Sequence, residues 1–167
     1  MSKTQDGLQA AFAGESQANR RYLAFAQAAD AEGKRNLAKL FRAVAEGETV
    51  HALSHFSTLG GVKNSSDNLR AAIAGETYEV ETMYPGFIAD AQGEKEKRAE
   101  LSFTRANEVE KIHQKIYTEA LAQVEAGKDI EGKDYYVCSV CGYLAEGSAP
   151  DYCPVCNAPR KKFIFVQ

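Results

Sequence analysis

The chain has 167 residues, of which 44% are hydrophobic, and a net charge of -3. A chain of this length can bury a hydrophobic core and is expected to form one main domain with an appendage. The weakly negative charge, without a basic stripe, argues against nucleic acid as a partner, and the lack of an apolar run of about 18 residues argues against a membrane span.

Hydrophobic periodicity and capping residues predict four long helices, two of them in the first part of the chain. The first is expected over residues 2–31, where Ser2 and Gln5 have the spacing of a capping box and Gly33 provides the stop. The second is expected over residues 35–59. These two helices are joined by a short turn, which predicts an antiparallel pair.

The third and fourth helices are expected in the second part of the chain. Ser66 and Asp67 are good capping residues, so the third helix is predicted over residues 66–91. Pro85 should kink or break it, because proline lacks an amide hydrogen and clashes with the preceding turn. The fourth helix is predicted over residues 94–126.

Each predicted helix carries acidic or imidazole side chains in the middle of its apolar face. Residues three and four apart share one face of a helix, and a bundle packed around these faces would bury them. The residues concerned are Glu15, Glu48, His51, Glu76, Glu79, Glu110 and His113. Unpaired ionised carboxylates would be strongly destabilising there, so they need cations or must stay protonated. A single motif of this kind more often lies on a solvated surface. Because all four helices carry one, metal ions are the favoured explanation.

The spacing of these residues indicates the kind of metal site. Glu48 with His51 and Glu110 with His113 form two Glu-x-x-His motifs, while Glu15 and Glu76 supply lone carboxylates from the other helices. This is the pattern of carboxylate-bridged two-metal sites in ferritin-like four-helix bundles. Oxygen-rich ligation with two imidazoles suits iron or manganese better than zinc, although ligand type alone leaves the choice open.

The connection between the second and third helices is short for a ferritin-like bundle. In such a bundle the second and third helices run parallel, so the chain must return along the bundle between them. The length of this return is set by the helical residues that follow Glu48 and those that precede Glu76, and at 1.5 Å per residue it is about 30 Å. Residues 60–66 reach at most about 25 Å when fully extended. We therefore hypothesise that two chains exchange helix pairs. Fraying of the second helix near Thr58 would relieve the shortfall instead.

Four cysteines near the C-terminus form two Cys-x-x-Cys motifs: Cys138 and Cys141, then Cys153 and Cys156. The start of the chain lacks an apolar signal region, so a cytoplasmic location is expected, and in that reducing compartment the cysteines should bind a metal rather than form disulfides. The residue after the second cysteine of each motif often needs positive φ so that backbone amides turn toward sulfur, which Gly142 adopts freely and Asn157 tolerates. Zinc and iron both accept four thiolates, so the spacing leaves a structural and a redox site open.

The chain resembles rubrerythrin over nearly its whole length. The matching segments are AGESQ at residues 13–17, RY at 21–22, LFR at 40–42, GETYE at 75–79, ETMYP at 81–85 and the paired cysteine motifs. Glu79 is the additional carboxylate that rubrerythrins carry. The resemblance implies a mainly α chain: a ferritin-like bundle over residues 1–127, a linker over 128–134 and a small rubredoxin-like β domain over 135–167.

The resemblance also implies roles for single residues. Glu48 and Glu110 would bridge two irons. Glu15 would bind one of them together with either His51 or Glu79, and Glu76 and His113 would bind the other. A further iron, or zinc, would be bound by Cys138, Cys141, Cys153 and Cys156. Tyr22 and Tyr84 match tyrosines that hydrogen-bond ligand carboxylates, although they also suit ordinary packing. His55 matches no ligand, and Asn157 stands where a rubredoxin usually has glycine.

The implied activity is reduction of hydrogen peroxide to water by a homodimer or higher oligomer. Electrons would pass through the four-cysteine iron from a reductase or rubredoxin linked to NAD(P)H. Two other readings remain open at this point. One is a ferritin-like ferroxidase that stores iron and carries a structural zinc tail, and the other is a helical scaffold without metal.

Overall fold

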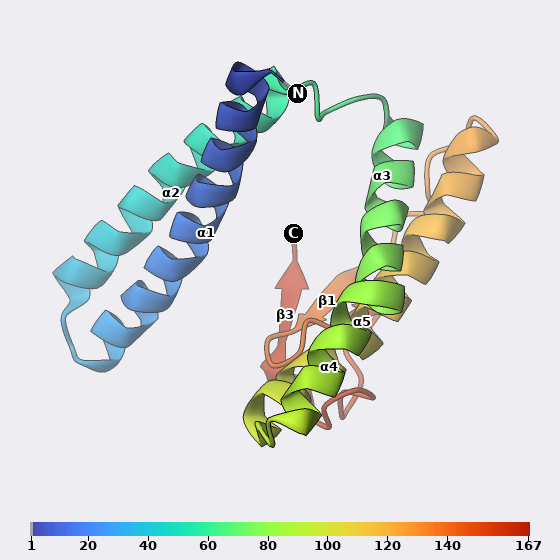
Figure 1. Cartoon of the computed structure of the whole chain (residues 1–167). Coiled ribbons are helices and arrows are strands. Elements are labelled where there is room, and N and C mark those ends of the chain that lie inside the picture. Colours follow the sequence, from blue (N-terminus) through green and yellow to red (C-terminus); the bar gives the residue numbers. More distant parts are fainter. Residues whose placement is uncertain (1) are drawn as a thin grey trace. The chain divides into compact units, whose positions relative to one another are not determined.

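The computed structural model describes residues 2–167 and divides by its contacts into two compact units, Met1–Lys63 and Asn64–Gln167 (Figure 1). The bundle predicted over residues 1–127 starts at Met1, which lies outside the described residues. The predicted fold class is confirmed, because long helices dominate the chain and a small antiparallel sheet follows them. The domain boundaries at residues 127 and 135 stay a prediction.

The first unit is a hairpin of two helices, α1 (Lys3–Ala31) and α2 (Arg35–Thr58). Ser2 caps α1 as predicted, with Gln5 N donating to its Oγ and its own amide donating to Gln5 Oε1. A stripe of alanines packs between the two helices, and these small side chains allow the backbones to approach closely. The buried alanines of this unit are Ala18, Ala26, Ala29, Ala38, Ala45 and Ala52.

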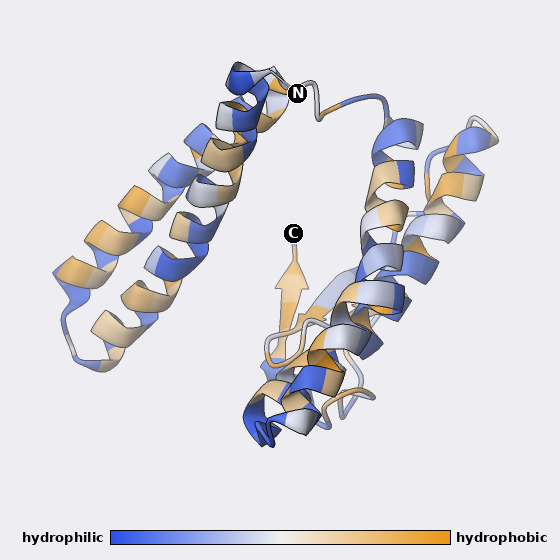
Figure 2. Ribbon diagram, viewed as in Figure 1, coloured by the Kyte–Doolittle hydropathy of each residue, from blue (hydrophilic) through white to orange (hydrophobic). Residues whose placement is uncertain are grey.

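The larger apolar residues of the hairpin remain uncovered within this unit. Phe25, Leu40, Val44 and Leu53 have between 42% and 61% of their surface exposed. Apolar residues recur along both helices in Figure 2. A helix pair of this kind offers an extended apolar surface to another partner.

The second unit begins with one long interrupted helix: α3 (Ser65–Tyr78), the π-helical turn η1 (Glu79–Met83) and α4 (Tyr84–Gly93). Asn64 is its cap, because its side chain accepts from the amide of Asp67, so the predicted cap at Ser66 or Asp67 was wrong. The predicted break at Pro85 is also absent. The chain instead widens into a π turn just before Pro85, with the Tyr84 amide bonded to the Glu79 carbonyl, and then continues as a helix.

The helix α5 (Lys97–Glu125) packs against both α3 and α4. The tail that follows has three strands in the order β2-β1-β3, with bounds Leu144–Glu146, Tyr135–Cys138 and Phe163–Val166, and the short 3-10 helix η2 (Arg160–Lys162). Both pairings are antiparallel. The small tail core consists of Cys138, Cys153 and Ala158, covered by neighbours that include Tyr143 and Phe163.

The tail packs against α5 of its own chain. A side chain at Gly142 would lie 3.8 Å from Cγ1 of Val109, which is 1% exposed. Nearer the C-terminal end of α5, Ile116 lines a small cavity together with Ile130 and Tyr135. The four-cysteine tail is therefore held to the helix that carries Glu110 and His113. None of the helices within residues 2–167 is long and apolar enough to cross a membrane.

Candidate metal centres

The hairpin brings together the first set of predicted ligands, which we call the first ligand trio: Glu15 of α1 with Glu48 and His51 of α2. One ligand atom from each of these residues lies within 4.8 Å of the others. His51 Nδ1 is 3.0 Å from Glu48 Oε2. The Glu48 side chain is 16% exposed, whereas that of His51 is 59% exposed, so the trio is open on the side of the imidazole.

The second unit brings together an equivalent set, the second ligand trio: Glu76 of α3 with Glu110 and His113 of α5. Their ligand atoms also lie within 4.8 Å of one another. His113 Nδ1 is 2.7 Å from Glu110 Oε2 and 4.0 Å from Glu76 Oε1. All three side chains are between 17% and 26% exposed, so this trio is more enclosed than the first.

Burial and mutual repulsion shift the acidity of the second ligand trio. Burial, together with the neighbouring Glu110 and Glu79 and a hydrogen bond with Glu110, raises the pKa of Glu76 to about 7. Burial and the charge of Glu110 also raise the pKa of Glu79, with His113 opposing this shift. Tyr84 faces the same carboxylates. Its pKa is raised mainly by burial and next by the negative charge of Glu79. A cation would remove this repulsion, so the donor set fits a metal ion of the kind predicted.

Glu79 reaches this region from the π-helical turn rather than from a regular helix. It is the first residue of η1, three residues after Glu76, and it interacts electrostatically with Glu110 and His113. A π turn changes the direction of the side chains within it, and such turns often occur at functional sites. The sequence predicted that Glu79 belongs to the site but did not predict the turn that presents it.

Each ligand trio has a polar link between its two helices that sequence reasoning missed. In the hairpin, Asn19 Nδ2 donates to Thr49 Oγ1 (2.8 Å) and to the carbonyl of Ala45 (2.7 Å). In the second unit, Gln114 Nε2 donates to Thr77 Oγ1 (2.6 Å). Three of these side chains are direct neighbours of a ligand in sequence: Thr49 of Glu48, Thr77 of Glu76 and Gln114 of His113. The only sequence signal was an amide and a threonine placed beside the ligand positions on facing helices.

The predicted secondary residues have packing partners. The Tyr22 ring lies 6.2 Å from that of Phe25 and 6.4 Å from that of Phe41. The Tyr84 ring lies 6.4 Å from those of Phe87 and Phe103. Hydrogen bonds from these tyrosines to ligand carboxylates stay a prediction. His55 is half-buried one turn beyond His51 on α2.

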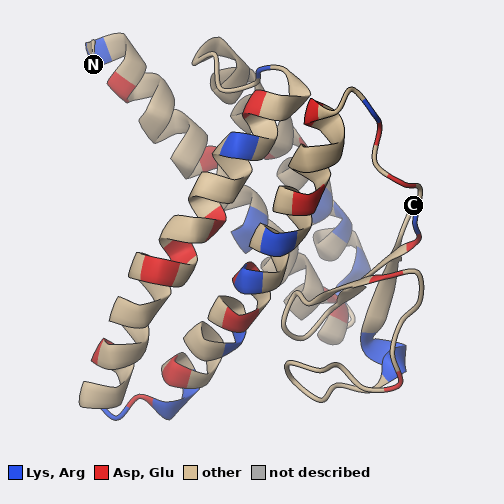
Figure 3. Cartoon of the chain, turned by 90° about the vertical axis from the view of Figure 1, so that its right-hand side faces the viewer, with Lys and Arg blue, Asp and Glu red and all other residues tan. Residues whose placement is uncertain are grey.

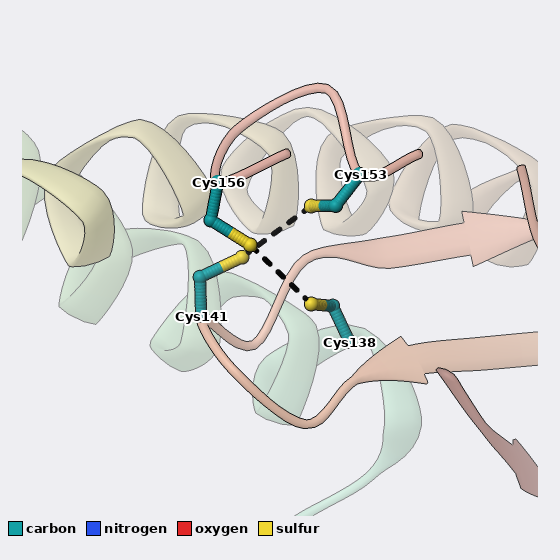
Figure 4. Close-up of side chains that lie close together, drawn as sticks. All are labelled: Cys138, Cys141, Cys153 and Cys156. Atoms are coloured by element: carbon teal, nitrogen blue, oxygen red, sulfur yellow. Dashed lines mark hydrogen bonds between the residues drawn. The ribbon is translucent and has the colours of Figure 1, made fainter. Parts of the chain in front are cut away.

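The four cysteines gather as predicted, and their sulfur atoms point toward one another (Figure 4). Cys138 Sγ is 3.6 Å from Cys156 Sγ, and Cys141 Sγ is 3.5 Å from Cys153 Sγ. All four are free thiols in the structure. Cys138 and Cys153 are buried, whereas Cys141 and Cys156 are half-buried. The cluster is therefore more open on the side of the second cysteine of each motif.

The backbone of each cysteine motif also turns toward sulfur. Gly142 and Asn157 have positive φ values of 86° and 58°, as the sequence led us to expect after each second cysteine. Burial raises the pKa of Cys141 and Cys156. Burial also acts on Cys138, but hydrogen bonds from the amides of Val140 and Cys141 outweigh it and lower the pKa. Four clustered sulfurs with amide donors fit a tetrathiolate iron or zinc.

Comparison with known proteins identifies what this arrangement is similar to. The family model described as Rubrerythrin matches residues 6–121, and that of the rubrerythrin rubredoxin-like domain matches residues 136–164. Rubrerythrin-2 of Clostridium acetobutylicum is 36% identical, over 96% of this chain and 95% of that protein. Rubrerythrin of Porphyromonas gingivalis is 38% identical, over 97% and 89%. A solved structure of fully reduced nigerythrin, described as all ferrous, has a TM-score of 0.58 and 31% identity, over 99% of this chain and 88% of that chain.

The raised pKa of Glu76 predicts how stability depends on pH when the metal is removed. Folding raises this pKa from 4.5 to about 7, so the carboxyl binds its proton more tightly in the folded state, and protonation stabilises the fold. That contribution is fully present below pH 4.5 and is lost as pH rises through about 7. We expect the thermal midpoint of metal-free protein to fall between about pH 5 and about pH 8, and Glu76→Gln to remove part of that fall. Circular dichroism melts measure it, with exposed Glu81→Gln as the control. An unchanged pH dependence in Glu76→Gln would contradict this account.

Proposed function

The chain belongs to the rubrerythrin family, and from this premise we propose that it reduces hydrogen peroxide to water at a di-iron site. The family carries two irons in its helical part and one iron or zinc in its rubredoxin-like part. The observation that carries the proposal is the pair of ligand trios, each of which joins two glutamates and one histidine from two helices.

In this proposal an α1–α2 hairpin and an α3–α5 unit combine their trios around two irons. Glu48 and Glu110 would be the ligands shared by the two metals, Glu15 would hold one iron, and Glu76 with His113 would hold the other. When bound, two adjacent irons supply both electrons needed to split the peroxide O–O bond. The bridging carboxylates hold the metal positions fixed, and the neighbouring polar links keep their helices in register.

Glu79 and His51 are proposed as alternative ligands to the same iron. Glu79 brings a negative charge and His51 a neutral imidazole, so an exchange between them matches the ligand charge to the metal charge. Two features support this role. The His51 side chain is 59% exposed, against 16% to 26% for Glu48, Glu76, Glu110 and His113, and Glu79 lies in the π turn beside the second trio.

Electrons are proposed to reach the bundle through the four-cysteine centre from an NAD(P)H-linked donor. Gly142 follows Cys141 and packs toward Val109, and Val109 directly precedes the bridging candidate Glu110. This contact lies within one chain. It supports a path in which the tail and the second ligand trio of the same chain are connected through a packed, buried valine.

Substitution of Glu79 tests the ligand-exchange mechanism. Glu79→Ala should leave the helical signal and melting temperature nearly unchanged while slowing peroxide turnover about tenfold or more, because it removes one of the two alternative ligands. Stopped-flow peroxide consumption measures the effect. The control is Glu81→Ala, an exposed glutamate in the same π turn. Equal turnover in wild type and Glu79→Ala would rule out the exchange.

We also propose that two chains exchange helix pairs, so that each bundle combines α1–α2 of one chain with α3–α5 of the other. The structure shows α2 helical through Thr58, with the Leu59 amide bonded to the His55 carbonyl, so the fraying that could have relieved the short link is absent. Residues 59–64 alone connect α2 to α3. These six residues reach about 22 Å at most, against the roughly 30 Å return needed within a single-chain bundle. The exposed apolar residues of the hairpin give the second copy a surface to cover.

A complementation experiment distinguishes exchanged from unexchanged dimers. One chain carries Glu15→Ala and Glu48→Ala, and the other carries Glu76→Ala and Glu110→Ala, so each alone lacks both glutamates of one trio. In an exchanged heterodimer one bundle receives both intact halves, and random pairing then restores about a quarter of the sites. Di-iron content by Mössbauer spectroscopy and peroxide turnover should both recover to that level after co-expression. The matched control pairs Glu15→Ala with Glu48→Ala, which cannot complement, and a failure of the first pair to recover would contradict exchange.

A further inference from the structure

A groove lies between α5 and the first cysteine motif of the tail. Its volume is about 290 Å³, and it is lined by Arg98, Leu101, Arg105 and Ala106 of α5 and by Val140 and Cys141 of the tail. Arg98, Leu101 and Arg105 are spaced three and four residues apart, so they share the face of α5 on which the tail packs. The groove is the place where the four-cysteine cluster meets the surface beside α5.

The groove has an apolar centre. Leu101 and Val140 are 49% and 46% exposed, although both are large aliphatic residues. Leu101 comes from the helix, and Val140 comes from the loop between the two cysteines of the first motif. Exposed aliphatic residues framed by polar ones are typical of a surface that contacts another protein.

The groove carries positive charge from Arg98 and Arg105. Basic and acidic residues are mixed along the helices (Figure 3). The lysines of α5 therefore lie close to glutamates. Each of the three lysines of α5 pairs with a glutamate of the same helix: Lys97 with Glu100 (2.8 Å), Lys111 with Glu108 (2.6 Å) and Lys115 with Glu119 (3.8 Å). Within residues 2–167, neither Arg98 nor Arg105 forms an ion pair. Two uncompensated guanidinium groups therefore flank the groove.

The groove also reaches the metal-binding sulfurs at an open point. Cys141 lines it and is half-buried, whereas Cys138 and Cys153 are 1% and 2% exposed. A molecule seated in the groove would contact the loop that carries Cys141. Electron transfer slows steeply with distance, so this open ligand is a suitable point of entry.

We propose that this groove docks an acidic one-electron carrier protein. Leu101 and Val140 contact an apolar patch on the carrier, and Arg98 and Arg105 attract the carboxylates around that patch. The carrier gives one electron to the four-cysteine centre, so the carrier is oxidised and the centre is reduced, and no proton moves. The inference rests on the proposed function, because it names the partner that supplies the electrons.

The test measures reduction of the full-length, iron-loaded protein by reduced flavodoxin, an acidic flavoprotein whose absorbance differs from that of a tetrathiolate iron. The variant Arg98→Glu/Arg105→Glu should slow the second-order rate about tenfold at low salt, and should lose the decrease with ionic strength that the wild type shows. The control Lys161→Glu/Lys162→Glu makes the same charge change on the exposed turn before β3. Reduction potentials of all three proteins are measured by redox titration and should agree.

The outcomes separate this proposal from the function on which it rests. If the control variant slows reduction as much as the arginine variant, the carrier does not dock specifically in the groove. If the arginine variant changes the reduction potential enough to explain its slower rate, the arginines tune the centre and do not dock the carrier. Either result overturns the proposal. If peroxide fails to reoxidise the reduced wild type, the proposed function itself is wrong.

Discussion

Repulsion among partly buried carboxylates is the constraint on which the helical part of this protein depends. Glu76, Glu79 and Glu110 lie close enough that burial and neighbouring charge raise the pKa of Glu76 to about 7. A fold does not gain stability from such a cluster without a cation, because each carboxylate opposes the ionisation of the next. The polar link from Gln114 to Thr77 joins the two helices that carry Glu76 and Glu110. A bound cation would relieve this repulsion, so the carboxylate cluster is suited to a metal ion.

The ligands are divided between two units that repeat the same local design. Each unit has a Glu-x-x-His motif on one helix, a lone glutamate on its partner helix and an amide-to-threonine link beside them. Neither unit holds enough ligands for two metals. Two half-sites joined by the short segment 59–64 give a physical reason for assembly by helix exchange. The tail adds a second metal centre that packs on α5 next to one of the half-sites.

Much of this could be predicted from sequence where the signal is local. Helix positions followed from periodicity and from caps such as Ser2 with Gln5, and the positive φ values of Gly142 and Asn157 followed from the cysteine motifs. The π turn could not be predicted, because Pro85 indicates only that a regular helix is unfavourable there and not how the backbone accommodates the proline. The docking of the tail on Val109 could not either. It depends on tertiary contacts between segments far apart in the sequence, which local patterns do not encode.

The most direct test of the account is the iron and zinc content per chain, in protein purified without added metal, for the wild type and for Glu48→Ala/Glu110→Ala. The account predicts about three irons per wild-type chain, two held by the carboxylates and one by the cysteines. The double variant should keep only the metal ion of the four-cysteine site. A wild type that holds a single metal ion per chain, unchanged in the double variant, would contradict the claim that the two ligand trios form a di-iron site.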